Sequence, residues 1–219
     1  MRDILPAHLV DFLRDRYIAG VAMAEASYEE SSADEDSITG ALGQAIAMPM
    51  PIVFTDPQGS YAVKISYRKV RGRGRDAPER LYGSDGIFQI TVTDEHGKAV
   101  RQKGLPFQSK KNWSGTNSAL ADQARDMQSS TGEGLILDFT PNGYSACRSS
   151  LVAEVNGNRH EVERRRGTRP LGVMLGIDFL NCTVGRVGLF YDAETERYKD
   201  NDNLVPPRHE LTTSVRAFR

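Results

Sequence analysis

Two stretches of this sequence decide the predicted fold: GSDGIFQIT at residues 83–91 and GLPFQSK at residues 104–110. Each contains a short apolar run of strand-forming residues, and turn-forming residues separate the two runs at 94–98. The pattern predicts strands over Ile87–Thr93 and Leu105–Ser109. We expect the two strands to be neighbours in one sheet, because they follow each other closely along the chain.

Apolar periodicity earlier in the chain predicts two helices. Apolar residues recur every three or four positions over Ile4–Ala24, which is the pattern of an amphipathic helix. A second helix is predicted to begin at Ser32, because Ser32 and Glu35 match the S-x-x-E capping box. Proline at position 49 is expected to end this helix.

The remaining elements complete a mixed fold. Alternation over Tyr61–Val70 predicts a third strand, which is expected to form an antiparallel meander with the two strands described above. A helix over Ser118–Gln128 and a strand over Leu135–Phe139 follow. The order of helix, three strands, helix and strand predicts an α/β (α+β) core in which helices flank a mixed sheet.

The chain is short enough to form one domain. Its 219 residues predict a single domain with a core over about 32–140, an N-terminal helix within 1–31 and a C-terminal extension over 141–219. The extension contains a predicted helix over Pro170–Leu180, whereas the tail beyond Asp192 is polar and loosely patterned.

The composition excludes several classes of protein. With 39% hydrophobic and 26% charged residues, the chain resembles an ordinary globular protein, and no apolar run approaches the roughly 18 residues of a membrane span. The N-terminus is charged and lacks the pattern of a secretory signal, so we expect a cytoplasmic protein without a membrane partner. Cys147 and Cys182 do not have the spacing of a zinc site or of a disulfide framework.

The charges are segregated along the chain although the formal net charge is only −1. Between Tyr61 and Trp113 there are 12 Lys and Arg residues against 5 Asp and Glu residues, an excess of 7 positive charges. A segment of this kind can attract a polyanion to one face of the protein. A solvated loop explains the Arg-rich part of the segment equally well.

Polar residues lie at the tips of the two central strands. Asp85 comes directly before the first strand, and Gln108 and Lys110 alternate at the end of the second strand, so these two project from one face. If the strands are neighbours, the three side chains converge. Carboxylate and amide oxygens are ligands that Mg²⁺ accepts. A lysine beside the metal could orient or help deprotonate a water that attacks phosphorus, or offset charge that develops on the phosphate.

This arrangement resembles the PD-(D/E)XK nuclease superfamily, in the variant with Gln in place of the second acid. The resemblance covers about residues 32–139 and rests on Asp85-Gly86 before a strand, Gln108-Ser109-Lys110 at the end of the next, and a following helix with Gln123. Mrr-like restriction nucleases and prokaryotic defence nucleases have similar motifs. The resemblance implies a restriction-endonuclease-like core, a Mg²⁺ or Mn²⁺ cofactor, and metal-dependent hydrolysis of phosphodiester bonds in nucleic acid, with DNA as the first expectation.

The resemblance also implies roles for individual residues. Asp85 would be the principal metal ligand, Gln108 the second ligand, and Lys110 the catalytic lysine. The neutral amide of Gln108 removes one negative charge from the site, so we expect weaker metal binding than in a site with two acids.

Glu35 has two interpretations. By the resemblance it is the helix acid that completes the metal site, since its spacing from the apolar residues of the predicted helix directs it towards the sheet. As the N3 residue of a capping box, it would instead bond to the start of its own helix. Glu30 and Asp36 are reserve candidates for the metal-binding acid.

Contacts with nucleic acid are expected from the basic segment and the helix after it. The expected residues are Arg71, Arg73, Arg75, Lys111 and Gln123. The chain has no recognisable sequence-reading domain, so a homodimer, a regulatory partner or an activator is expected to supply specificity or control.

Two other functions stay open. The chain could be a catalytically inactive nucleic-acid-binding or regulatory module that keeps the nuclease fold, which the neutral Gln108 permits. It could also be a structural or interaction protein in which the basic segment is only a solvated face.

Overall fold

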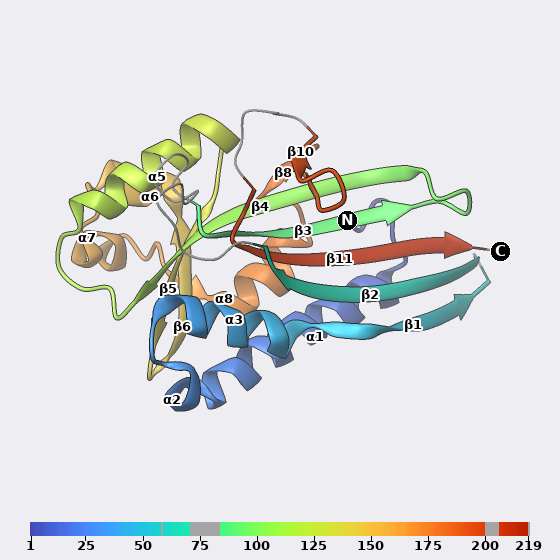
Figure 1. Cartoon of the computed structure of the whole chain (residues 1–219), viewed down its shortest axis with the longest axis horizontal. Helices are drawn as coiled ribbons and strands as arrows, with labels where there is room; N and C mark the ends of the chain where they lie inside the picture. The colour runs from blue at the N-terminus through green and yellow to red at the C-terminus, as the bar shows by residue number, and fades with distance from the viewer. Residues whose placement is uncertain (58, 71–83, 200–205, 219) are drawn as a thin grey trace.

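The protein is built around a nine-stranded mixed sheet (Figure 1). The computed structural model describes residues 1–57, 59–70, 84–199 and 206–218. The strand order is β1-β2-β11-β3-β4-β5-β6-β7, and β8 pairs with β4. The strands are β1 (Met48–Asp56), β2 (Gly59–Lys69), β3 (Gly86–Thr93), β4 (Ala99–Lys111), β5 (Leu135–Thr140), β6 (Gly143–Arg148), β7 (Arg169–Pro170), β8 (Arg186–Val187) and β11 (His209–Phe218), with β9 (Tyr191–Asp192) and β10 (Arg197–Tyr198) as a separate pair.

The last strand of the chain lies in the middle of the sheet. Strand β11 pairs antiparallel with β2 and parallel with β3, whereas β3 and β4 form the expected antiparallel hairpin. The predicted three-strand meander is therefore wrong, because β11 separates β2 from β3. The chain beyond residue 140, which the sequence presents as an extension, contributes this central strand.

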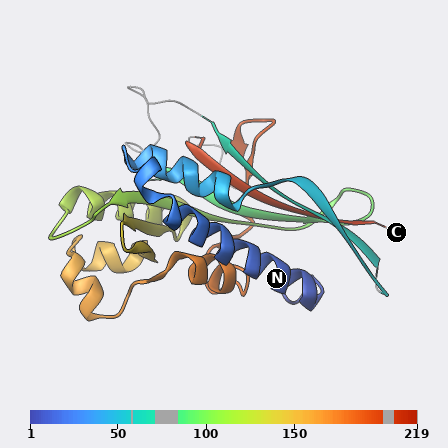
Figure 2. The same cartoon turned by 90° about the horizontal axis from the view of Figure 1, so that it is seen from below.

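Helices and a small hairpin cover the two faces of the sheet. The helices are α1 (Ala7–Ala26), α2 (Tyr28–Ser31), α3 (Glu35–Ile46), α5 (Ser118–Thr131), α6 (Ser149–Glu154), α7 (Arg159–Arg164) and α8 (Leu171–Val173), which continues as a π-helix over Met174–Phe179. Figure 2 shows α1 between α3 and the α8 segment. These three share the largest apolar cluster with the sheet, and α5, α6 and α7 form a second cluster.

Strand β3 shows how the two faces differ. Phe88 packs into the large cluster that α1, α3 and the α8 segment share with the sheet, whereas its neighbour Ile87 packs on the other face against Tyr191 and Tyr198 of the β9–β10 hairpin. Side chains alternate between the faces of a strand, so both sides of β3 are covered. The tip of this strand, where the polar residues lie, is accordingly held from both faces.

The start of α3 differs from its prediction. The helix begins at Glu35 and its N-cap is Asp34, whose Oδ1 accepts a hydrogen bond from the backbone N of Ser37 at 2.8 Å. The hydroxyl of Ser32 donates instead to the carbonyl of Glu29. The capping box from Ser32 to Glu35 is therefore wrong, and the Glu35 carboxylate is free of a capping role.

Two long strands, β1 and β11, were not predicted. Strand β1 follows α3 directly, where Pro49 was expected only to end the helix, and β11 occupies the tail that looked loosely patterned. The predicted helices and strands at 61–70, 118–128, 135–139 and 170–180 are present with boundaries that differ by a few residues. In the part of the chain that the structure describes, no helix is both long and apolar enough to cross a membrane.

Candidate functional site

A buried polar site forms where β3 begins and β4 ends. Gly86 of β3 pairs with Phe107 of β4, and the backbone N of Asp85 donates to the carbonyl of Phe107 at 2.8 Å. This register places Asp85 beside Gln108, as the sequence predicted. Strand β4 continues alongside β5 beyond the start of β3, and there the backbone N groups of Ser109 and Lys111 donate to Asp85 and Glu35.

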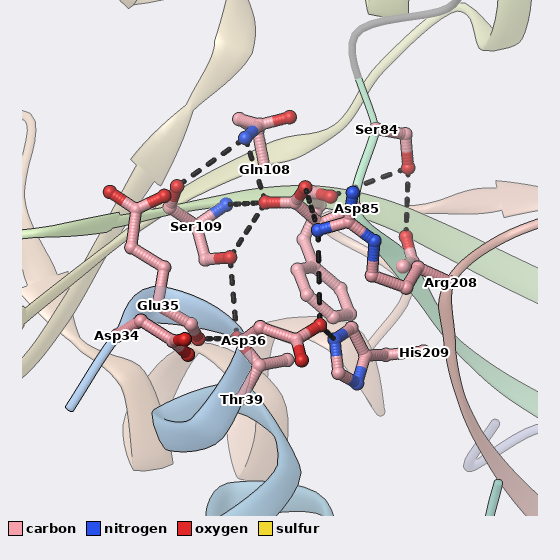
Figure 3. Close-up of polar contacts among 12 residues, drawn as sticks. Asp34, Glu35, Asp36, Thr39, Ser84, Asp85, Gln108, Ser109, Arg208 and His209 are labelled. Carbon is pink, nitrogen blue, oxygen red and sulfur yellow. Dashed lines mark hydrogen bonds and ion pairs between the residues drawn. The ribbon is translucent and has the colours of Figure 1, made fainter. Parts of the chain in front are cut away.

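Asp85 is the centre of this site (Figure 3). Only 4% of the residue is exposed, and its Oδ2 accepts hydrogen bonds from Gln108 Nε2 at 2.7 Å, Ser109 N at 2.8 Å and Ser109 Oγ at 2.6 Å. Burial raises the pKa of Asp85 to about 6, and the negative charge of Glu35 adds to the rise. The hydrogen bonds from Ser109 and the positive charge of Lys110 oppose it. Because burial makes the negative charge of this carboxylate unfavourable, a cation that balances the charge would be stabilised here.

Gln108 presents an unused acceptor. The residue is 1% exposed, and its Oε1 is buried without a hydrogen-bond partner among the described residues. Its Nε2 faces Asp85, so the amide nitrogen acts as the donor to the carboxylate. A half-turn of the amide group would direct Oε1 to the same side, where it could bind a cation together with Asp85.

Glu35 and Lys110 form an ion pair next to Asp85. Glu35 Oε2 lies 3.7 Å from Lys110 Nζ, and Glu35 Oε1 accepts from the backbone N of Lys111 at 3.1 Å. The side chain of Lys110 is 20% exposed and that of Glu35 is 38% exposed, so this side of the site is open to solvent. Helix α3 is fixed against the strand by a further bond from Thr39 Oγ1 to Ser109 Oγ at 3.2 Å.

The structure adds a set of residues that the sequence did not predict for this site. His209 Nε2 lies 3.0 Å from Asp36 Oδ1, and His209 Nδ1 lies 2.8 Å from the hydroxyl of Tyr67. Since a carboxylate only accepts, the proton of neutral His209 is on Nε2, and Tyr67 donates to Nδ1. Arg208 Nη1 lies 3.8 Å from Asp36 Oδ1 and 3.8 Å from Asp85 Oδ1, so it connects the two groups.

Burial and charge determine the protonation of this set. Burial lowers the pKa of His209 to about 4, although Asp36 opposes the shift. Burial raises the pKa of Asp36, but the ion pair with Lys69 and the contact with His209 outweigh it, so this pKa lies below its usual value. At neutral pH His209 is therefore neutral and Asp36 is ionised. The strand at 209–218 was not predicted; the alternation of apolar and polar residues there could have indicated a strand, but it does not indicate the neighbours of that strand.

The expected nucleic-acid contacts are spread over different places. Arg71, Arg73 and Arg75 lie outside the described residues. Lys111 lies at the site, but its Nζ donates to the carbonyl of Ser32. Gln123 lies half-buried on α5. Of the reserve acids, Asp36 belongs to the site, whereas Glu30 is exposed on α2.

The donor set fits one divalent cation that keeps several waters. Within residues 1–57, 59–70, 84–199 and 206–218 no group of three or more His, Cys, Asp and Glu side chains is arranged to hold a metal ion. The available set has two carboxylates, Asp85 and Glu35, and the unpartnered oxygen of Gln108. Mg²⁺ is often held by one or two carboxylates and water, so these side chains are of the type that such a cation accepts.

Comparison of the chain with protein-family models, curated proteins and solved structures gave no match. The evidence for a function therefore comes from the geometry and chemistry of this site.

Proposed function

We propose that the protein is a metal-dependent nuclease that hydrolyses phosphodiester bonds of nucleic acid, with DNA as the first substrate to test. The observation that supports this most is the direct contact of Asp85 with Gln108 beside the ion pair of Lys110 with Glu35. Two strand tips and one helix end supply these four side chains, in the arrangement that the D…QxK motif would need.

Asp85, Gln108 and Glu35 would hold a Mg²⁺ or Mn²⁺ ion through side-chain oxygens. When bound, the cation supplies positive charge that polarises a water and a phosphate oxygen. Substrate would approach from the side of Lys110 and Glu35, because Asp85 and Gln108 are buried. The described residues offer one such site, so cleavage of both strands of a duplex requires two chains or two encounters.

Lys110 would act as a charged donor. Its Nζ pairs with Glu35 at the solvent-exposed side of the site, so we assign it to the phosphate oxygens, where negative charge grows during attack. In the proposed reaction, the oxygen of water bonds to phosphorus and the bond from phosphorus to one sugar oxygen breaks. The water loses its proton to solvent, and the departing oxygen takes up a proton from solvent.

A second candidate is an inactive nucleic-acid-binding module with the same fold. The observation that favours it is Arg208, a cation already placed 3.8 Å from Asp85 Oδ1. In such a protein Arg208 would permanently balance the buried acid, and nucleic acid would bind without hydrolysis.

One experiment separates the two candidates. Supercoiled plasmid and single-stranded RNA are incubated with the protein in Mg²⁺, Mn²⁺ or EDTA. The nuclease predicts cleavage with metal only, which Asp85→Asn and Lys110→Met abolish. Asp15→Asn is the matched control, because Asp15 is 68% exposed on α1 and pairs with Arg14. Cleavage that persists in Asp85→Asn contradicts the assignment, and binding without any cleavage supports the inactive module.

A further inference from the structure

Arg208 occupies a particular position between two acids. Its Nη1 is equidistant from Asp85 Oδ1 and Asp36 Oδ1, at 3.8 Å from each, and its side chain is 9% exposed. Figure 3 shows the guanidinium between the two carboxylates. At this distance the pairs are electrostatic and lack a short hydrogen bond.

The backbone fixes this position. The backbone N of Arg208 and that of His209 both donate to the carbonyl of Asp85, each at 3.0 Å. The start of β11 is thereby attached to the residue that introduces β3. Any movement of the guanidinium is consequently a rotation of its side chain, while its Cα stays beside Asp85.

Arg208 adds one of the positive charges that face the acids of the site. Among the described residues, three acids, Asp85, Asp36 and Glu35, face three cations. The cations are Lys69, Lys110 and Arg208, and His209 is neutral. A divalent cation adds two positive charges in a buried space, which favours the departure of a resident cation or the arrival of an anion.

From this geometry we propose that Arg208 is the resident counter-cation of the site: its guanidinium pairs with Asp85 and Asp36 in the metal-free protein, gives up Asp85 when a divalent cation binds, and turns to the phosphate of the substrate. The inference rests on the metal site of the proposed function. A guanidinium forms paired hydrogen bonds with phosphate oxygens as readily as with a carboxylate, so one side chain can serve both partners.

The test measures Mn²⁺ affinity without substrate. Free Mn²⁺ is followed by electron paramagnetic resonance during titration of the full chain and of Arg208→Gln, Arg208→Lys and Arg125→Gln. Arg125 is the matched control, since it pairs with Asp122 on the exposed face of α5. We expect Arg208→Gln to bind Mn²⁺ about tenfold more tightly or better, because a competing charge is removed, and the other two variants to match the wild type. Equal or weaker binding by Arg208→Gln overturns the proposal.

A measurement on the wild type covers the case in which Arg208→Gln does not fold. During a Mg²⁺ titration, the Nε–Hε resonance of Arg208 should shift in step with binding, while that of Arg125 should not. A constant Arg208 resonance at saturating Mg²⁺ overturns the proposal.

The two proposals fail separately. Tighter Mn²⁺ binding by Arg208→Gln without cleavage by any variant refutes the nuclease and supports the role of Arg208. Cleavage by the wild type with unchanged Mn²⁺ affinity in Arg208→Gln refutes the role of Arg208 alone.

Discussion

Replacing Asp85 by Asn should stabilise the metal-free protein at neutral pH. The folded state raises the pKa of Asp85 from 3.8 to about 6, so ionised Asp85 makes folding less favourable above that pH. A difference of about 2 pKa units corresponds to about 3 kcal/mol of unfolding free energy. Asn carries no charge, and its Oδ1 can accept the same bonds from Ser109, so Asp85→Asn should recover most of this free energy.

The pH dependence identifies the cause. Between pH 3.8 and about 6 folded Asp85 keeps a proton that the unfolded chain has released, so its contribution to stability falls as the pH rises through this window. His209 acts in the opposite sense, because its pKa falls from 6.5 to about 4 on folding and stability is lost as the pH drops through that window. In the wild type, the contributions of Asp85 and His209 to the pH dependence of the unfolding free energy nearly cancel. Asp85→Asn should expose the slope of His209, about 1.4 kcal/mol per pH unit.

The assay is urea unfolding in EDTA from pH 4 to 8, followed by circular dichroism and by the fluorescence of the single tryptophan, Trp113. The difference in unfolding free energy between Asp85→Asn and wild type should be close to zero at pH 4 and reach about 3 kcal/mol at pH 7. Asp15→Asn, which neutralises an exposed acid, should give no such pH dependence. A difference that does not vary with pH, or a loss of stability in Asp85→Asn at pH 7, would refute the reasoning.

Three further predictions concern other parts of the protein. Lys110→Met should lower the rate of metal-dependent cleavage at least about a hundredfold while leaving Mn²⁺ affinity no weaker, and an equal loss of both would contradict a purely electrostatic role. Asp34→Ala should lower the unfolding free energy by about 1 kcal/mol and Ser32→Ala by much less, since Asp34 is the N-cap. A larger loss for Ser32→Ala in urea unfolding would contradict this and support the capping box at Ser32. Burial raises the pKa of Cys147 to about 12, whereas Cys182 is exposed, so a thiol reagent should modify Cys182 in the native protein and reach Cys147 only after unfolding; rapid native modification of both would disagree with the structure.

The sequence predicted the part of the site that depends on neighbouring strands. Asp85 and Gln108 meet because β3 and β4 are consecutive and form a hairpin, and the alternation of side chains determines which residues share the strand tip. Contacts of this kind follow from local patterns. The meeting of Asp85 with Gln108 is confirmed, and the metal-binding role of the pair stays a prediction.

The other half of the site depends on a pairing that no local pattern specifies. Arg208 and His209 reach Asp85 because β11 inserts between β2 and β3, more than a hundred residues away along the chain. A parallel neighbour has no tight turn that would fix its register, so the sequence gives no indication of this partner. The network of Asp36, Tyr67 and His209 was missed for the same reason.

The start of α3 was misjudged for a different reason. The predicted cap was Ser32, which matches the S-x-x-E pattern, whereas the cap in the structure is Asp34. Asp34 is the stronger choice in the structure because its extended backbone aims the carboxylate at the N of Ser37. As a result, the Glu35 carboxylate is available to pair with Lys110.

The central claim is that Asp85 and Gln108 hold a divalent cation where the start of β3 lies beside the end of β4. Diffraction data from crystals grown with Mn²⁺, collected at a wavelength where manganese scatters anomalously, test it most directly. The account predicts an anomalous peak about 2.0–2.6 Å from Asp85 Oδ1 and Gln108 Oε1, with the guanidinium of Arg208 turned away from Asp85. Arg208 still beside Asp85, with manganese absent from the site or bound elsewhere, would contradict it.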